Sequence, residues 1–339
     1  MTSTDVIVPD LTGEDAKRLT SELFGLDASA DELPSYVDRN FRMTAATGER
    51  FVLKIAHGGE NEAVLDAQNA MMRHLHEHGV ATPHALPAKN GKFRVTIPGP
   101  RGHEHSVRLV TYLEGTPLAK ISPHPPELLE DLGRFLGRVD AALASFEAPA
   151  LQRELRWNLA DASMARAHLD ALEGSRRERA TRIFDRFEAR VRPALSELPQ
   201  SVIHNDANDY NILVHDGRIA CLIDYGDSVH SARACELAIC LTYAMLEKDD
   251  PIAAVVPVVR GYQSALELNE RELELLIDLI YTRLCVSVTL SAHESRLHPE
   301  NEYLNVTEEH AWQLLDQLDA LDRAAIASSF IGAAHGDAQ

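Results

Sequence analysis

Apolar and polar residues alternate in short runs over the first third of the chain, which is the pattern of strands with one buried face. Residues 36–55 predict two strands that join near Thr47 and Gly48, the second being Arg50–Ile55. Val107–Leu113 predicts one further strand. The first part of the chain is therefore expected to be rich in β structure.

Two helices are predicted among these strands. The first spans Thr12–Phe24, where Thr12 is a plausible cap with Asp15 three residues on. The second spans Asn61–His78, and Gly79 is a suitable C-cap. Gln68 falls within the apolar stripe of this second helix, so its amide is expected to point inward. That stripe comprises Val64, Ala67, Met71 and Leu75, and the opposite polar face comprises Glu62, Asp66, Asn69 and Arg73.

The pattern changes after the last of these strands. Glu114–Pro117 contains a Gly and a Pro and interrupts the strand pattern, and helical periodicity dominates beyond it. We therefore expect an α+β chain of two lobes. Residues 1–113 would form a small β-rich lobe, and residues 114–339 a larger, mostly helical one.

One β segment stands out within the helical part. Ser201–Val214 reads as a strand, a polar loop and a second strand, and the turn at Asp216-Gly217 leads to a third strand that ends on Asp224. An Asp-Gly pair between two β-branched runs is typical of a tight hairpin. The hairpin is expected to bring Asp206, Asn211 and Asp224 together. Their carboxylate and amide oxygens suit Mg²⁺ rather than zinc.

Composition and charge narrow the class of protein. A chain of 339 residues fits two lobes, and 45% hydrophobic residues with a mean hydropathy of −0.20 indicate a globular protein. The net charge, 33 − 52 = −19, argues against a nucleic-acid partner, which requires a basic face. It is compatible with a small cationic substrate. Acidity also commonly serves solubility alone.

Features that would direct the chain out of a reducing compartment are not found in the sequence. The four cysteines show no paired spacing and read as buried thiols. The N-terminal residues lack the basic and apolar regions of a signal peptide. Leu275–Leu290 is the most apolar stretch, but Asp278 and Arg283 interrupt it, so no membrane span is predicted. We expect a cytoplasmic protein with no membrane partner.

The spacing of the hairpin residues resembles a known family. The order H-x-D-x-x-x-x-N, followed by I-D-x-G thirteen residues after the Asn, resembles the catalytic and metal-binding loops of the protein-kinase-like fold. Asn205 stands where protein kinases have Arg, which moves the resemblance to the small-molecule branch, the aminoglycoside phosphotransferase and choline kinase group. Within that group the segments HNDANDYNILV and LIDYGDSVHS are most similar to hydroxylysine kinase-like enzymes. The resemblance implies a two-lobed, protein-kinase-like fold.

The resemblance also implies roles for the hairpin residues. Asp206 would be the catalytic base, and His204 is expected to brace the loop through hydrogen bonds. Asn211 and Asp224 would hold the Mg²⁺ ions that bridge the phosphates of ATP or GTP.

Four residues of the first lobe are implied to contact the nucleotide. Lys54 would touch the α- and β-phosphates from its strand. Gln68 occupies the place where the family usually has Glu, and it would face Lys54 as a neutral partner. The backbones of Thr111 and Leu113 would hydrogen-bond the nucleobase. A surface position for Lys54 and a satisfied core amide for Gln68 are the alternatives.

Three further carboxylates are candidates for the acceptor side. Asp209, Asp227 and Glu236 follow or lie within the hairpin, and each is suited to bind a substrate ammonium group. Each can instead be a carboxylate that stabilises a loop or a helix end. Residues 299–304 resemble a C-terminal segment of the hydroxylysine kinase-like group, either lining the acceptor pocket or connecting two helices.

Two functions are compatible with these features. The first is a phosphotransferase that moves the γ-phosphate of ATP or GTP to the hydroxyl of a small amine or amino acid, with hydroxylysine-like acceptors first and homoserine, aminoglycosides or choline and ethanolamine next. The second is a pseudokinase-like module that binds nucleotide without turnover, which Gln68 favours. The presence of Asp206, Asn211, Asp224 and Lys54 together argues for the first.

Overall fold

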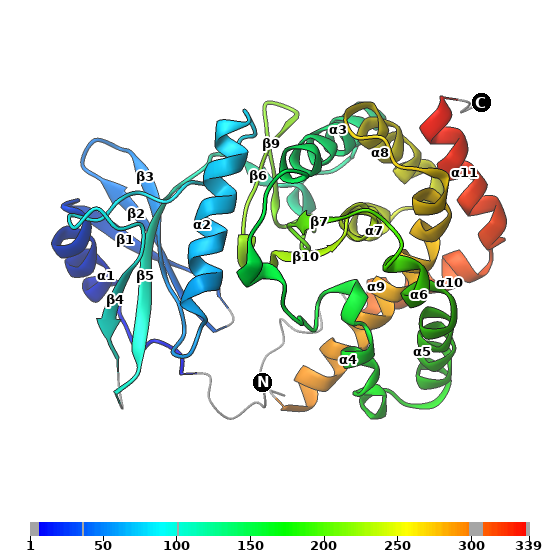
Figure 1. The fold of residues 1–339 in the computed structure, drawn as a ribbon, viewed down its shortest axis with the longest axis horizontal. Helices are drawn as coiled ribbons and strands as arrows, with labels where there is room; N and C mark the ends of the chain where they lie inside the picture. The colour runs from blue at the N-terminus through cyan, green and yellow to red at the C-terminus, as the bar shows by residue number, and fades with distance from the viewer. Residues whose placement is uncertain (1–6, 36, 100–101, 298–307, 337–339) are drawn as a thin grey trace. The chain divides into compact units, whose positions relative to one another are not determined.

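The computed structural model describes residues 7–35, 37–99, 102–297 and 308–336 (Figure 1). The chain divides into two compact units, Met1–Glu114 and Gly115–Gln339. Strands and two helices form the first unit, and the second is mostly helical. The predicted α+β class is confirmed.

The first unit is built on a five-stranded sheet in which every pair of neighbours is antiparallel, in the order β1-β2-β3-β5-β4. Its strands are β1 Ala28–Leu33, β2 Arg39–Ala45, β3 Arg50–Ile55, β4 Val95–Pro98 and β5 Glu104–Thr111. The predicted hairpin of β2 and β3 and the predicted strand β5 are confirmed. Sequence reasoning missed β1, because this edge strand has the polar sequence ASADEL and lacks a clear apolar alternation.

Helices cover both faces of this sheet (Figure 1). On one side lie α1, Gly13–Leu19, and the π-helical turn η1, Thr20–Phe24; Thr12 and Asp15 form a capping box at the start of α1. The apolar core on this side consists of Ala16, Leu19, Phe41, Met43, Leu53, Ile55, Val107 and Leu109. Each fully buried side chain of Leu or Ile size stabilises the fold by roughly 1.5–3 kcal/mol.

The other face of the sheet carries α2, Glu62–Glu77. Asn61 caps it by accepting from the Ala63 N–H, and Gly79 follows its end with a φ of 73°. Gln68 is buried as predicted, but so is Asn69, which sequence reasoning had assigned to the polar face. Asn69 is drawn inward because its side-chain oxygen accepts from Arg108 on β5.

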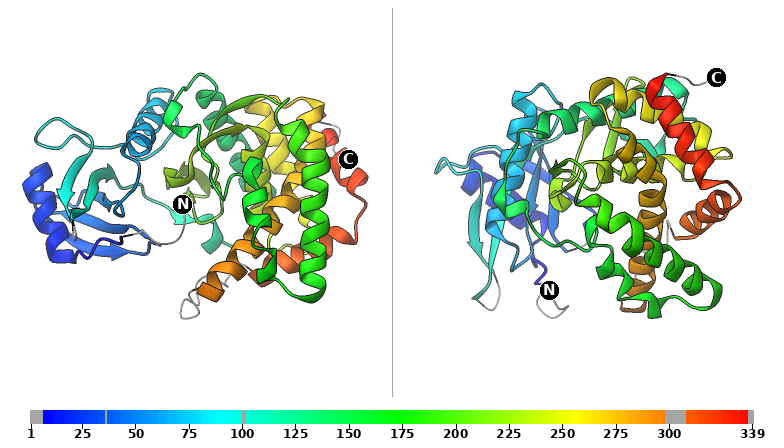
Figure 2. Two further views of the ribbon diagram at one scale, coloured as in Figure 1. Left: turned by 60° about the horizontal axis from the view of Figure 1, so that its bottom comes forward. Right: turned by 45° about the vertical axis from the view of Figure 1, so that its right-hand side comes forward.

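The second unit is a helical assembly with short β ladders (Figures 1 and 2). Its α-helices are α3 Pro126–Leu143, α4 Ser163–Arg166, α5 Gly174–Arg186, α6 Arg192–Leu195, α7 Ala234–Met245, α8 Pro251–Ala265, α9 Glu270–Leu297, α10 Glu308–Asp319 and α11 Arg323–His335. Short 3₁₀ or π turns lie at η3 Leu118–Lys120, η4 Pro149–Leu151, η5 Leu159–Asp161, η6 Leu169–Ala171, η7 Phe187–Val191 and η8 Tyr225–Asp227. Its strands are β6 Thr116–Pro117, β7 Gln200–Ile203, β8 Ile212–His215, β9 Arg218–Leu222 and β10 Val229–Ala232.

Close backbone packing joins α3 to α8. A Cβ atom at Gly133 would lie 1.9 Å from the Val258 carbonyl oxygen, and one at Gly261 would lie 2.0 Å from that of Glu130. No larger residue fits at either position without separating the helices. Both helices also pack against α7.

Helix α9 is long and apolar enough to span a membrane by length and composition, and 83% of its most apolar window is buried inside the protein. That burial accounts for its composition, since a core helix is apolar on most of its surface. The charged residues Asp278 and Arg283 lie within it and are themselves buried. They anchor contacts to neighbouring segments.

The hairpin of β8 and β9 has the predicted turn. Asp216 and Gly217 have φ values of 49° and 73°, as a two-residue turn of this type requires. Strand β6 pairs with β8 on the other side, whereas β7 pairs separately with β10. Sequence reasoning missed β10, a four-residue strand that pairs with β7.

Candidate active site

The hairpin aligns Asn211 with Asp224. Asn211 directly precedes β8, and its carbonyl oxygen accepts from the Ile223 N–H at 2.9 Å. Asp224 is the next residue, and it has a left-handed φ of 64°, uncommon for a residue other than Gly. The two predicted oxygen ligands therefore lie at the same end of adjoining strands.

Hydrogen bonds fix Asp206 against the same end of the hairpin. The Asn211 Nδ2 donates to Asp206 Oδ2 at 2.7 Å and to the Asp206 carbonyl at 2.9 Å. The Asn208 Nδ2 donates to Asp206 Oδ1 at 3.0 Å. The carboxylate is thus held by two amide groups of its own loop.

His204 braces this loop, as predicted. Its Nε2 donates to the Ile223 carbonyl at 3.0 Å, and its Nδ1 accepts from the Asp206 N–H at 3.2 Å. These two partners assign the ring proton to Nε2. The ring thereby links the loop to the strand that leads to Asp224, and its edge packs on Tyr225.

The structure argues against Glu236 as an acceptor ligand. Glu236 is 0% exposed, and its Oε2 accepts from the Asn205 N–H at 2.6 Å. Burial, reinforced by the nearby charge of Asp140, raises the pKa of Glu236 well above its usual range. This side chain supports the loop backbone, where Asn205 adopts a φ of 67°. The alternative reading of Glu236 as a loop-stabilising carboxylate therefore replaces the expectation that it binds substrate.

Asp227 lies close enough to Asp206 to affect its pKa, whereas Asp209 does not belong to that group. Burial raises the pKa of Asp206 to about 7; the negative charges of Asp227 and Asp224 add to the rise, and the positive charge of Arg283 opposes it. Burial raises the pKa of Asp209 to about 6, and the charged groups that act on it are Glu247 and Lys248. Asp227 thus belongs to the cluster around Asp206, whereas Asp209 faces another group of charges.

Arg283 was missed as a site residue. Its Nη2 lies 3.4 Å from Asp206 Oδ1, although the two residues are 77 positions apart in the chain. The available signal was a charged residue inside an apolar run, which sequence reasoning used only to exclude a membrane span. A buried charge needs a partner, and here that partner is the predicted catalytic base.

In the first unit, Lys54 and Arg108 are neighbours on the face of the sheet that α2 covers. They are directly paired across β3 and β5, and residues paired in this way project to the same side. The Arg108 Nη1 donates to Gln68 Oε1 at 3.0 Å and to Asn69 Oδ1 at 3.2 Å. Gln68 thus holds Arg108, a partner that sequence reasoning did not name. Whether it also faces Lys54 remains a prediction.

Asp38 and His57 lie close to Lys54. His57 donates to Asp38 Oδ1 from its backbone at 2.9 Å and contacts the same oxygen with its ring at 3.0 Å. Burial alone would raise the pKa of Asp38, but the His57 bonds and the charge of Lys54 lower it overall. Asp38 therefore remains an anion near the predicted phosphate-binding lysine.

One of the backbone groups predicted to contact the nucleobase is already used inside the protein. The Thr111 N–H donates to the His84 carbonyl at 3.0 Å. A base contact from Thr111 would therefore use its carbonyl oxygen. Leu113 follows β5 and is half-buried. Residues 299–304, the other predicted acceptor segment, lie outside the described residues.

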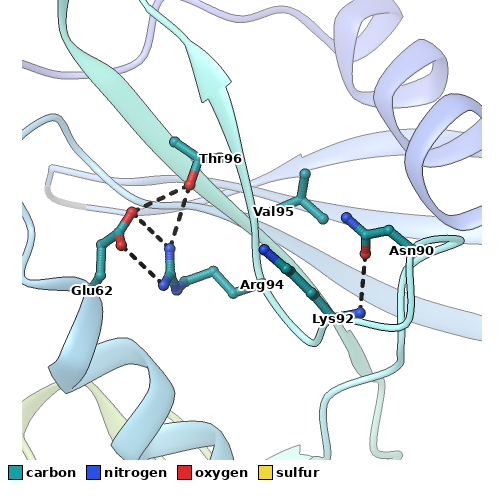
Figure 3. A pocket seen from close by; sticks show the side chains of 6 residues that line it. All are labelled: Glu62, Asn90, Lys92, Arg94, Val95 and Thr96. Atoms are coloured by element: carbon teal, nitrogen blue, oxygen red, sulfur yellow. Dashed lines mark hydrogen bonds and ion pairs between the residues drawn. The ribbon is translucent and has the colours of Figure 1, made fainter.

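Two surface pockets lie at the β4 edge of the first unit. The one in Figure 3 has a volume of about 330 Å³, and Arg94 crosses it to pair with Glu62. Arg94 also pairs with Asp66, so this arginine fixes the exposed side of α2 to the sheet. Neither pocket contains a predicted site residue, and the residues that line the first are Glu62, Asn90, Lys92, Arg94, Val95 and Thr96.

An α+β fold with carboxylate and amide side chains gathered at one end of a hairpin is typical of kinase-like phosphotransferases. The chain belongs to the phosphotransferase enzyme family, whose model matches residues 31–276. It is 32% identical over 333 residues to the hydroxylysine kinase of Danio rerio, a match covering 93% of this chain and 94% of that relative.

Solved structures agree on the fold. An amicoumacin kinase, determined in complex with AMP-PNP, Ca²⁺ and Ami, superposes with a TM-score of 0.71 at 15% identity, covering 91% of this chain and 94% of that one. A microcompartment-associated aminopropanol kinase superposes with a TM-score of 0.68 at 16% identity, covering 94% and 95%. The protein is a phosphotransferase with the two-lobed fold that the hairpin motif predicted.

Proposed function

We propose that this protein transfers the γ-phosphate of ATP or GTP to the hydroxyl of a small hydroxylated amine, with hydroxylysine-like amino acids as the first candidates. The observation that carries the proposal is the position of Asp206. Two amide side chains hold its carboxylate beside Asn211 and Asp224, which is the arrangement of a base next to metal ligands.

Asp206 is the proposed general base. It accepts the proton of the acceptor hydroxyl as that oxygen attacks the γ-phosphorus. Burial raises the pKa of Asp206 to about 7, and a base is most effective when its pKa lies near the working pH. Two amide groups of its own loop donate to this carboxylate.

Asn211 and Asp224 are the proposed Mg²⁺ ligands. The Asn211 Nδ2 is committed to Asp206, so its side-chain oxygen points away from that carboxylate and is oriented as a ligand. Asp224 supplies an exposed carboxylate from the adjoining strand. This all-oxygen donor set fits Mg²⁺, which when bound would bridge the nucleotide phosphates and offset their charge.

Lys54 is the proposed phosphate contact of the first unit. Its neighbour Arg108 adds a second cation to the same face of the sheet. Thr111 and Leu113 are proposed to contact the nucleobase through their backbones. Such contacts do not favour ATP over GTP.

Asp227 supports a cationic acceptor. It acts electrostatically on Asp206, and burial with the nearby charge of Asp224 raises its pKa. An ammonium group would relieve this crowding of carboxylates, as hydroxylysine, homoserine, aminoglycosides or ethanolamine can each do. Similarity to a hydroxylysine kinase over nearly the whole chain puts that acceptor first. Asp209 is a second candidate for a more distant amine.

A pseudokinase-like module is the alternative, and Gln68 is the observation in its favour. The bond from Arg108 to Gln68 gives this amide a structural role that does not depend on Lys54. The neutral residue is therefore weak evidence for loss of turnover. A protein that only binds nucleotide would also not require a fixed base at Asp206.

The test is a phosphotransfer assay with purified protein, ATP or GTP, and the presence or absence of Mg²⁺. The acceptors are hydroxylysine, homoserine, ethanolamine, choline, an aminoglycoside and an uncharged polyol at matched concentrations. Mg²⁺-dependent phosphorylation of hydroxylysine above the others is expected. Nucleotide binding without transfer to any acceptor would instead support the pseudokinase-like module.

A further inference from the structure

A guanidinium from outside the catalytic loop contacts Asp206. Arg283 lies on α9, and its Nη2 is 3.4 Å from Asp206 Oδ1. Its side chain is only 3% exposed, against 23% for Asp206. The arginine is therefore part of the protein core, whereas the carboxylate it contacts opens to solvent.

Arg283 is fixed independently of Asp206. Its Nη2 donates to the Tyr243 hydroxyl at 3.1 Å, and its Nη1 donates to the Trp157 carbonyl at 3.2 Å. The guanidinium carbon also lies 5.2 Å from the Trp157 ring centre and 5.5 Å from that of Tyr243. Both contacts are within the range of cation–π attraction. These contacts hold the guanidinium in the core, where its Nη2 also reaches Asp206 Oδ1.

The hydrogen bonds around Asp206 leave a defined position open for a proton. A carboxylate has about four acceptor positions, two on each oxygen. Oδ1 receives Asn208 and Arg283, whereas Oδ2 receives Asn211. Among the bonds that the described residues make to this carboxylate, the position left is on Oδ2.

We propose that Arg283 is a positioning residue that holds Asp206 Oδ1 so that Oδ2 receives the proton of the acceptor hydroxyl. This inference rests on the proposed function. In the step, the hydroxyl O–H bond breaks and its proton moves to Oδ2, while the acceptor oxygen forms a bond to the γ-phosphorus. The bond from that phosphorus to the β–γ bridging oxygen breaks, and the nucleoside diphosphate leaves.

Two other roles for Arg283 fit the geometry less well. Direct binding of the acceptor requires an exposed guanidinium, which a side chain 3% exposed does not provide. A purely structural role would not require contact with Asp206. The packing between Trp157 and Tyr243 could be made by an apolar residue of similar length.

The experiment compares kcat and KM for Arg283→Met, Arg283→Lys and Tyr243→Phe with the wild type. Arg283→Met retains length but loses every donor, so kcat should fall on the order of 10²-fold, as for other small misplacements of a reacting group. KM for nucleotide should stay within about twofold of the wild-type value, because Arg283 acts on the proposed general base, Asp206, and not on the nucleotide. Arg283→Lys should recover about tenfold of the loss, since it keeps the charge but not the planar fork. Tyr243→Phe should show a smaller loss in the same direction.

Arg186→Met is the matched control. Arg186 is a half-buried arginine that pairs with Asp278 on the same helix α9, at 2.7 Å, away from Asp206. The Arg186→Met substitution should lower the melting temperature and leave kcat unchanged. A similar fall in kcat for Arg186→Met would show that α9 integrity alone matters and would overturn the proposal.

Two further outcomes would overturn it. One is a kcat for Arg283→Met equal to that of the wild type. If Arg283→Met does not fold, a wild-type kcat in both Arg283→Lys and Tyr243→Phe would overturn the proposal instead. The other is a crystal structure of Arg283→Met in which Asp206 keeps its rotamer. If the wild-type protein transfers phosphate to no acceptor, the proposed function is refuted. The positioning role of Arg283 can then still be tested by comparing the Asp206 rotamer in the wild type and in Arg283→Met.

Discussion

The two units of this protein differ in the ionisable side chains that they bury around their proposed sites. In the first, Arg108 is 5% exposed and donates to neutral oxygens of α2, with Lys54 beside it on the same face of the sheet. In the second, Glu236 and Asp140 are 0% and 1% exposed, and the carboxylates of Asp206 and Asp227 lie near them.

The difference matches the ligands that each unit is proposed to bind. Amide acceptors such as Gln68 satisfy the hydrogen bonds of a cation without adding a negative charge. A positive potential then remains for phosphates. Around Asp206 the donors are likewise mainly amides, which leave negative charge for a metal or an ammonium group. The overall charge of −19 reveals neither pattern, because it sums over both units.

The largest effect is expected at Asp206, in the proposed site of the second unit. Asp206→Asn should lower kcat on the order of 10²–10⁴-fold, because an amide cannot accept the proton. Nucleotide affinity should change little, and isothermal titration would measure it directly. Asp216→Asn, in the exposed hairpin turn, is the control and should retain full activity. Near wild-type kcat in Asp206→Asn would remove the base assignment.

Glu236 tests whether the buried acids of the second unit are structural. Glu236→Ala leaves the Asn205 N–H without its partner, which should cost roughly 1–3 kcal/mol of unfolding free energy in urea titrations. Burial raises the pKa of Glu236, and the amide oxygen of Glu236→Gln can still accept from the Asn205 N–H, so this variant should retain most of the stability. Equal losses in the two variants would contradict a stabilising role for this hydrogen bond.

The local parts of this site were readable from the sequence, and the long-range parts were not. The Asp-Gly turn closes the hairpin of β8 and β9 and so brings Asn211 and Asp224 to the same end of it, because the pattern spans few residues. The helical period likewise turned Gln68 inward. These features follow from backbone geometry alone.

Arg283 and Arg108 could not be predicted in the same way. Arg283 reaches Asp206 across 77 residues, and Arg108 reaches Gln68 across 40. Such contacts depend on how distant elements pack, α9 against the Asp206 loop in one unit and α2 against the sheet in the other. A single sequence can show that a charged residue in an apolar run needs a partner, but it does not identify that partner.

Asp140 gives the second unit a pH-dependent stability. Burial raises the pKa of Asp140 from 3.8 to about 7, while the Tyr262 hydroxyl donates to it at 2.6 Å. The folded state therefore keeps a proton that the unfolded state has released. This contribution to stability is complete below the unfolded pKa and is lost as the pH rises through about 7.

Asp140→Asn should flatten this dependence. The amide cannot titrate and still accepts from Tyr262 through its oxygen. Differential scanning calorimetry at about pH 5 and about pH 8 should show a larger loss of Tm in the wild type than in the variant. Equal slopes in the two proteins would assign the pH dependence to other groups.

Gln68→Glu is expected to have the smallest effect, and it sharpens the comparison from the side of the first unit. The new carboxylate would make a charge-assisted bond with Arg108 and lie on the face that Lys54 occupies. The attraction is offset by the cost of burying the charge, so the net change should stay below about 1 kcal/mol. We therefore expect KM for nucleotide to shift by less than about fivefold, with kcat unchanged. A tenfold rise in kcat would instead mean that the neutral amide limits turnover, as a pseudokinase-like module would require.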